Sequence, residues 1–194
     1  MPYRFLDVGD TGVTVEFGDG VDPALLAAVA AFDRSVQSAM AVGQLRGVVE
    51  TVPTFRSLTL IYDPLHTSRA EIDPILVSLL GQPVGARVLS GRQWRLPVCY
   101  GGQFGPDLEP MAGATGLSPG EIVALHAANT YSIYMLGFLP GFPFMGDLPE
   151  RLPLPRRAEP RLRVPAGSVA TAGRLTAIYP WESPGGWHLL GRCP

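Results

Sequence analysis

Apolar residues recur with two different spacings along the first eighty residues, one typical of β-strands and one typical of α-helices. Apolar and polar residues alternate from Val13 to Phe17, which is typical of a half-buried strand, and a turn at residues 9–12 precedes them. Asp22 then suits the N-cap of a helix and Pro23 suits its first position, where a missing N–H costs nothing. The helix carries one apolar stripe with steps of three or four residues: Leu25, Val29, Phe32, Val36 and Met40.

Two further strands are predicted at residues 48–52 and 58–62, and a second helix follows them. The predicted order of elements is ββαββα, in which one strand is not assigned to residues, and a strand near residues 93–99 would complete it. This order predicts a compact α+β arrangement in which helices pack on a sheet.

The second helix has a clear start and an ambiguous middle. Ser68 and Glu71 form a capping box, so the helix is predicted to begin at Ser68. Pro74 then lies in its interior, where proline removes a hydrogen bond and clashes with the preceding turn. The helix is therefore either kinked at Pro74 or begins afresh at Asp73-Pro74.

Proline and glycine become more frequent in the second half of the chain. Of 20 prolines, 15 follow residue 81, and so do 16 of 23 glycines. Because both residues break regular structure, we place a boundary within residues 81–85 and expect two domains, 1–83 and 84–194.

The second domain is predicted to be mainly β. One helix is expected, since Ser118 and Glu121 form a capping box with Pro119 at the first helical position. Short strand-like runs separated by Gly/Pro turns predict a β-barrel or sandwich: residues 131–136, 161–164, 175–179 and 187–190.

The charge composition excludes several chemistries. All 15 basic residues are Arg, and the chain has no Lys. Schiff-base catalysis, a lysine base and a phosphate-binding loop with its Lys are therefore excluded, so any ATP must be bound largely by another chain. The net charge of −2 argues against a nucleic-acid partner.

The cysteine count and the length of the apolar runs indicate the cellular compartment. Cys99 and Cys193 are too few for a disulfide framework, and residues 1–7 lack the pattern of a signal peptide. Since no apolar run approaches the roughly 18–20 residues of a membrane span, we expect a cytoplasmic protein with no membrane partner.

A long irregular segment is the first candidate for function. Residues 137–167 contain seven prolines and little predicted structure, and connections longer than about 12–15 residues are usually functional or disordered. Three phenylalanines argue against disorder, because they are costly to leave in water. Phe138, Phe142 and Phe144 either line a pocket or partner surface, or are buried in the barrel core.

Arginines are concentrated in the same part of the chain. Guanidinium groups suit carboxylates and phosphates, so the cluster could hold an anionic substrate. We favour a surface role, in which Asp147, Glu150 and Glu159 neutralise several of them. The five residues are Arg151, Arg156, Arg157, Arg161 and Arg163.

The remaining polar candidates do not form a recognisable catalytic set. Ser168, Ser183 and His188 lie in Gly/Pro turns, but no nucleophile elbow surrounds either serine, and His188 is expected to be a hydrogen-bonded surface strand residue. His126 is expected on a helix surface. The spacing of His66 and His126 to each other and to Cys99 predicts no metal site, and no catalytic acid or base is assigned.

Several ordered motifs together resemble one family, that of allophanate hydrolase subunit 1. This family includes the B subunit of bacterial 5-oxoprolinase and the sporulation-kinase inhibitor. The resemblance covers nearly the whole chain. Its motifs are Gly9-Asp10, Val15-Glu16-Phe17-Gly18, residues 47–57, Tyr62-Asp63-Pro64, residues 97–102, 104–108, 137–143 and 163–169, and Ser183-Pro184-Gly185-Gly186-Trp187.

The resemblance implies a ferredoxin-like α+β N-terminal domain and a cyclophilin-like β-barrel. It implies two partners, an allophanate hydrolase subunit 2-type companion and a lactam-utilisation type subunit, in a complex that opens 5-oxoproline to glutamate with ATP. It leaves two alternatives: an inhibitor that binds a sensor histidine kinase, and a component of a biotin-dependent, urea-type carboxyltransferase. Relatives usually continue past Arg192 with more strand, so the barrel is expected to be shorter at this end.

The resemblance also suggests which residues line a substrate site or an interface shared with the companion. No cofactor is expected on this chain alone, and ATP is expected in the complex. The expected lining consists of Tyr100, Phe104, Phe138, Phe142, Ser168, Gly185, Gly186, Trp187 and Arg192.

Overall fold

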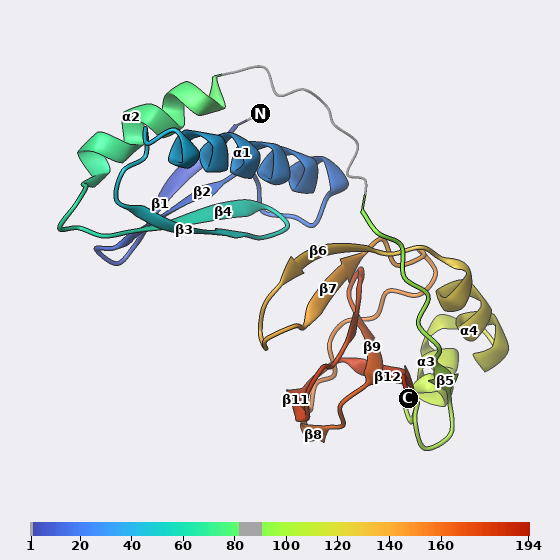
Figure 1. Cartoon of the computed structure of the whole chain (residues 1–194). Coiled ribbons are helices and arrows are strands. Elements are labelled where there is room, and N and C mark those ends of the chain that lie inside the picture. Colours follow the sequence, from blue (N-terminus) through green and yellow to red (C-terminus); the bar gives the residue numbers. More distant parts are fainter. Residues whose placement is uncertain (1, 82–90) are drawn as a thin grey trace. The chain divides into compact units, whose positions relative to one another are not determined.

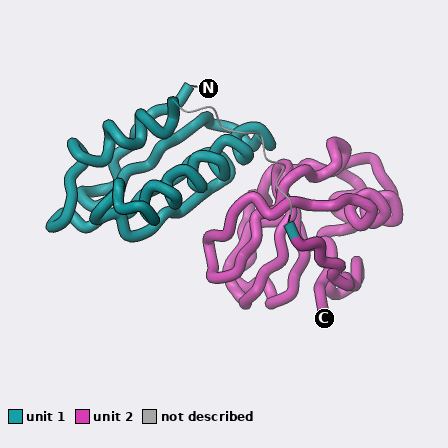
Figure 2. Tube along the Cα trace, turned by 45° about the horizontal axis from the view of Figure 1, so that its top comes forward, with its two compact units in different colours: residues 1–91 teal, residues 92–194 magenta. Residues whose placement is uncertain are grey.

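The chain divides into two compact units, each with its own antiparallel sheet and hydrophobic core. A computed structural model describes residues 2–81 and 91–194, and the units comprise residues 1–91 and 92–194 (Figure 2). The expected boundary between residues 83 and 84 lies outside the described residues. Both units mix helices with antiparallel strands, as the α+β prediction requires.

Unit 1 has the predicted order ββαββα. Its four strands form an antiparallel sheet in the order β1-β2-β4-β3, and both helices pack on one face of it (Figure 1). The elements are β1 (Arg4–Val8), β2 (Gly12–Glu16), α1 (Pro23–Ala41), β3 (Val48–Pro53), β4 (Ser57–Tyr62) and α2 (Arg69–Leu80).

Local capping fixes where both helices of unit 1 begin. The Asp22 carboxylate accepts the Ala24 N–H at 2.6 Å, and Ser68 and Glu71 form the predicted capping box. Helix α2 then runs through Pro74 as one helix from Arg69 to Leu80, which decides between the two alternatives. Proline removes one backbone donor there, and burial of the apolar face of α2 against the sheet offsets this loss.

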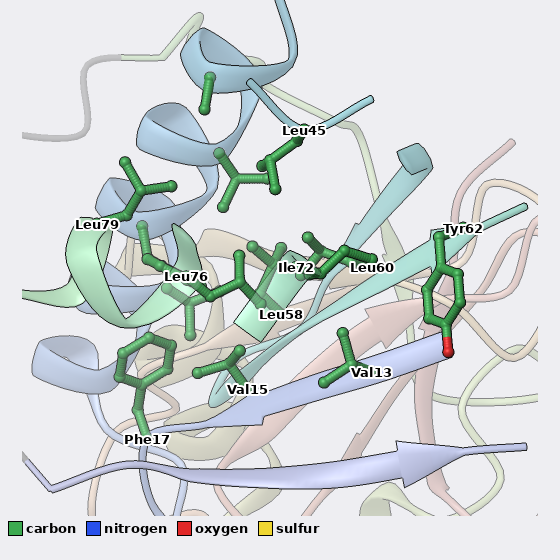
Figure 3. Close-up of a cluster of buried hydrophobic side chains, with 14 residues drawn as sticks. Val13, Val15, Phe17, Leu45, Leu58, Leu60, Tyr62, Ile72, Leu76 and Leu79 are labelled. Atoms are coloured by element: carbon green, nitrogen blue, oxygen red, sulfur yellow. The ribbon is translucent and has the colours of Figure 1, made fainter. Parts of the chain in front are cut away.

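The core of unit 1 lies between the sheet and the two helices. Figure 3 shows Val13 and Val15 of β2 beside Leu58 and Leu60 of β4, with helix side chains above them. The apolar stripe predicted on α1 faces this core, with Val29, Phe32 and Val36 buried. The apolar side chains on one face of the strands and those on one face of the helices therefore pack together in a single layer.

The strand expected near residues 93–99 does not complete the sheet of unit 1. Residues 92–98 have no regular structure, and Cys99–Tyr100 form the short strand β5 of unit 2, paired with β12 (His188–Arg192). The prediction was wrong because an alternating pattern shows that a segment can pair, without showing which strand it meets.

Unit 2 contains a six-stranded antiparallel sheet, β5-β12-β9-β10-β7-β6, and a two-stranded ribbon, β11-β8. The remaining elements are α3 (Leu108–Thr115), α4 (Pro119–Ala128), β6 (Ser132–Leu136), β7 (Pro143–Gly146), β8 (Arg161–Val164), β9 (Ser168–Ala172), β10 (Leu175–Ile178) and β11 (Ser183–Gly185). Helix α3 and strands β7, β9 and β11 were not predicted. A short helix without a side-chain cap and short strands beside Gly/Pro turns give weak sequence signals.

Strand β9 is the centre of unit 2, because all five of its residues are buried. Ala170 and Ala172 face an aromatic cluster that contains Phe142, Tyr179 and Trp187. On the other face, the Thr171 hydroxyl reaches Met111 of α3. Small side chains on β9 let both layers pack closely against it.

The core of unit 1 yields a prediction. Leu60→Ala removes a fully buried side chain and should lower the free energy of unfolding of unit 1 by about 3 kcal/mol, through lost burial and a cavity. Leu65→Ala, at a side chain that is 89% exposed, should change it by less than about 0.5 kcal/mol. Urea unfolding followed by circular dichroism measures both, and equal effects would contradict the assigned core.

Candidate functional site

The most highly connected polar group in unit 2 is the carboxylate of Asp107. It is 2% exposed and accepts hydrogen bonds from Arg157 at 2.9 Å, from Arg161 at 2.7 Å and from the Leu189 amide at 2.7 Å. Asp107 stands at the start of α3, Arg157 and Arg161 belong to the Pro-rich segment, and Leu189 lies in β12. One carboxylate therefore fastens three separate segments together.

The charge of Asp107 is stabilised by its neighbours. Burial alone would raise the pKa of this carboxyl. The hydrogen bonds from Arg161 and the Leu189 amide, with the charges of Arg161 and Arg157, outweigh burial and hold the pKa below its usual value. Asp107 is thus an ionised structural anion rather than a proton donor at neutral pH.

The expected neutralisation of the arginines by Asp147, Glu150 and Glu159 was wrong. Asp107 holds Arg157 and Arg161, and Glu182 holds Arg163 at 2.8 Å. These acids are 19 to 54 residues away in sequence, so closeness along the chain could not identify them.

His126 is buried instead of lying on a helix surface, which corrects the expectation for it. Its Nε2 lies 2.9 Å from the Thr176 hydroxyl, which itself donates to the Ala170 carbonyl. Nε2 must therefore carry the proton, and Nδ1 accepts from the Tyr100 hydroxyl at 2.8 Å. Burial lowers the pKa of His126 to about 4, so the ring is neutral at pH 7.

Five of the nine expected site residues lie at one end of β12. Phe142 packs edge-to-face on Trp187 and on Phe138, with ring centroids 5.9 and 5.3 Å apart. Gly185 makes room for the Tyr179 hydroxyl, which a Cβ at this position would strike, and the Gly186 carbonyl accepts the Arg157 amide at 2.8 Å.

The other four expected residues lie at the opposite end of β12. Tyr100 pairs with Gly191, and Arg192 pairs with Ser168. The Ser168 hydroxyl donates to the Pro165 carbonyl, the Arg192 Nε donates to the Ala166 carbonyl, and the Phe104 amide donates to the Gly101 carbonyl.

The nine residues therefore form two groups and not one. Trp187 and Arg192 are five positions apart, and a strand rises about 3.4 Å per residue, so roughly 17 Å separates the two ends. A small substrate cannot touch both groups through this chain alone.

The phenylalanines of the Pro-rich segment were expected either to line a pocket or partner surface or to be buried in the core, and the structure shows one exposed and one buried. Phe142 is 1% exposed and belongs to the aromatic core, as the core interpretation requires. Phe138 is 62% exposed, and its backbone has a φ of 66°, which is unusual for a residue with a side chain. Phe138 thus presents an aromatic ring to solvent from a constrained turn.

The glycine-rich turn at residues 100–105 does not form a phosphate cradle. The Gly101 amide donates to the Leu190 carbonyl, and the Gly105 amide donates to the Gly101 carbonyl. Gly105 lies so close to the Leu190 carbonyl that no Cβ would fit. These amides are used within the fold and are not free to bind a phosphate.

The remaining features of the described residues involve none of the nine expected site residues. His188 is the predicted strand residue, with Nε2 donating to the Pro155 carbonyl. Unit 1 has a depression of about 240 Å³ over Leu45 and Ile72, which includes none of the nine residues. Across residues 2–81 and 91–194 there is no helix long and apolar enough to span a membrane, and no group of three His, Cys, Asp or Glu side chains suited to a metal.

Removing the charge of Asp107 should weaken unit 2. Asp107→Asn leaves two guanidinium groups without their partner and should lower the free energy of unfolding by about 3 kcal/mol. Glu150→Gln, at an exposed carboxylate, should change it by less than about 0.5 kcal/mol. Urea unfolding followed by tryptophan fluorescence measures this, because all three tryptophans lie in unit 2. Equal effects would show that Asp107 does not hold the three segments together.

His126 should make unit 2 sensitive to acid. Its pKa is about 4 in the folded protein and about 6.5 when unfolded, so the unfolded state binds the extra proton between these values. Stability should therefore fall by about 2–3 kcal/mol from pH 7.5 to pH 4.5 through this group. His126→Gln should remove that part of the loss, whereas His188→Gln should keep it. Urea unfolding midpoints at pH 7.5 and pH 4.5 measure this loss, and an equal loss in His126→Gln and His188→Gln would contradict the assignment to His126.

The sequence of this chain is similar to those of two curated proteins, both B subunits of 5-oxoprolinase. The B subunit of 5-oxoprolinase from Bacillus subtilis (strain 168) is 35% identical over 207 residues, which cover 99% of this chain and 82% of that protein. The B subunit of 5-oxoprolinase from Escherichia coli O157:H7 is 38% identical over 185 residues, which cover 95% and 81%.

A solved structure and a family model complete the comparison. The crystal structure of TTHA0988 matches 94% of this chain at 40% identity with a TM-score of 0.77, and this chain spans only 35% of that chain. The family model described as "Carboxyltransferase domain, subdomain C and D" matches residues 3–194. The chain therefore belongs to the carboxyltransferase domain family, subdomains C and D.

Proposed function

We propose that this chain is a subunit of a heteromeric, ATP-dependent 5-oxoprolinase, which opens 5-oxoproline to glutamate. The observation that carries the proposal is the similarity to the B subunits of two 5-oxoprolinases, at 35% and 38% identity over more than four fifths of each. Identity at this level extends along both units and is not confined to one motif.

The nucleotide chemistry belongs to other subunits in this proposal. The chain has no Lys, the Gly101, Phe104 and Gly105 amides of its glycine-rich turn are used internally, and Arg157 and Arg161 are neutralised by Asp107. These residues do not fit a triphosphate. The allophanate hydrolase subunit 2-type companion and the lactam-utilisation type subunit would therefore bind ATP between them.

We also propose the finer domain description that the resemblance implies, with domains 1–83 and 84–194. The six-stranded sheet of unit 2, with its ribbon and two helices, supports a cyclophilin-like barrel. The two helices on one face of a four-stranded antiparallel sheet support a ferredoxin-like layer in unit 1. The element order ββαββα differs from the βαββαβ order of ferredoxin-like folds, so only the layer is shared.

Exposed aromatic residues are the best candidates for contact with the shared site. Phe138 is the most exposed of the nine expected residues that carry an aromatic ring, and Phe104 follows at 37%. Buried Phe142 packs against Phe138, and Phe142 and Trp187 cannot themselves be tested without disturbing the core. The function of this chain is thus to shape a surface that the companion completes.

A reconstituted complex tests the function. The chain is co-expressed with both partner subunits, and glutamate formed from 5-oxoproline and ATP is measured. We expect release only when all three subunits are present. Full activity without this chain, or none with all three, would contradict the proposal.

Phe138→Ala tests the role of the exposed ring. Loss of an anchoring aromatic contact should lower kcat/KM for 5-oxoproline by at least about tenfold, while the unfolding midpoint of the chain stays unchanged. Leu162→Ala is the matched control, because Leu162 is also apolar and exposed in unit 2 and should leave activity as it was. Equal activity of the two variants would remove Phe138 from the site.

A further inference from the structure

Two buried polar atoms in the ribbon of β8 and β11 have no hydrogen-bond partner among the described residues. They are Nη1 of Arg161 in β8 and Oγ of Ser183 in β11. A buried polar atom that stays unbonded is costly, so nearly all such atoms in folded proteins have a partner. A serine hydroxyl can both donate and accept, whereas a guanidinium nitrogen only donates. Arg161 Nη1 therefore requires an acceptor from outside the described residues.

The Tyr179 hydroxyl lies at the same place and forms no hydrogen bond with the described residues. Arg161 pairs with Gly185 across the ribbon, and a Cβ at Gly185 would strike this hydroxyl. Burial raises the pKa of Tyr179, and the charges of Arg156 and Arg161 oppose that rise, so both guanidinium groups lie near the ring. Two unbonded donors and a further guanidinium group thus gather at one end of the ribbon.

Positive charge is in excess around these donors. Asp107 shares its single carboxylate charge between Arg157 and Arg161, and it accepts from Arg161 only through Nη2. Arg156 is exposed and forms no ion pair with any of the described residues. Donors with surplus positive charge suit an anion that offers two acceptor oxygens, as a carboxylate does.

The donors adjoin the first of the two groups of expected site residues. The Gly186 carbonyl accepts the Arg157 amide, and the Tyr179 ring packs on Phe142 with ring centroids 5.0 Å apart. The Arg161 side chain is 23% exposed although its Nη1 is covered, so a small shift of this flexible side chain brings Nη1 to the surface. Because the donors lie mostly below the surface, they suit a small molecule rather than a protein segment.

We propose that Arg161 Nη1, the Tyr179 hydroxyl and the Arg156 guanidinium bind one carboxylate group, that of 5-oxoproline. The site for a carboxylate follows from the unbonded donors, whereas the choice of 5-oxoproline rests on the proposed function. One carboxylate oxygen accepts from Arg161 and the other from Tyr179, while the charge of Arg156 adds to the attraction. The carboxylate does not react when the lactam opens, so binding through it leaves the ring amide free for groups of the other subunits.

Calorimetric titration of the full chain with 5-oxoproline tests the site. The matched probe is 5-oxoprolinamide, which has the same ring and lacks the negative charge. We expect the acid to bind and the amide to bind at least about tenfold more weakly, because the amide forms no charge-assisted hydrogen bonds with the donors. No binding of the acid, or equal binding of acid and amide, would overturn the proposal.

Two conservative variants locate the site. Tyr179→Phe removes only the hydroxyl, and Arg161→Lys keeps a positive charge beside Asp107 but removes the second guanidinium nitrogen. Each should weaken binding of 5-oxoproline at least about tenfold. The same changes at a buried tyrosine of unit 1 and at an exposed arginine of unit 2, Tyr62→Phe and Arg174→Lys, should change it less than about twofold. Tryptophan fluorescence checks that each variant is folded, and equal binding by Tyr179→Phe and Tyr62→Phe would overturn the proposal.

The binding measurement is independent of the test of function, because it uses this chain without the partner subunits. If the reconstituted complex releases no glutamate although this chain binds 5-oxoproline through its carboxylate, the proposed function fails and the site stands. If the complex is active and this chain does not bind 5-oxoproline, the site fails and the proposed function stands.

Discussion

The buried charge of Asp107 is the constraint around which unit 2 is assembled. A carboxylate withdrawn from water must be neutralised and hydrogen-bonded, and this one is satisfied only when Arg157, Arg161 and the Leu189 amide converge on it. That requirement brings the Pro-rich segment against β12 and fixes the turn that precedes α3. The aromatic cluster and the helix layer then pack on either face of β9, whose own side chains are small enough to admit both.

The sequence predicts features whose causes are local. The caps at Asp22, at Ser68 with Glu71 and at Ser118 with Glu121 were all identified, because each needs only residues within a few positions of one another. The apolar stripe of α1 and most strands were identified for the same reason. Asp107 and His126 were missed as structural centres. Their partners lie between 26 and 82 residues away, and no periodic pattern connects them.

The division of the expected site into two groups has a physical origin as well. Sequence motifs identify residues that matter without giving the distance between them, and a strand of five residues is long compared with a small substrate. The aromatic residues differ among themselves for a similar reason. Phe138 and Phe142 are only four positions apart, yet Phe138 is exposed, with a positive φ, and Phe142 lies in the core.

Pairing of β5 with β12 also determines the order in which the protein can fold during synthesis. The two strands are separated by nearly ninety residues, and β9 is enclosed only once β12 lies beside it. Unit 1 draws all its strands and helices from the first eighty residues and can close while later residues are still being made. Unit 2 cannot close until β12 has left the ribosome, so its aromatic residues remain open to chaperones for most of translation.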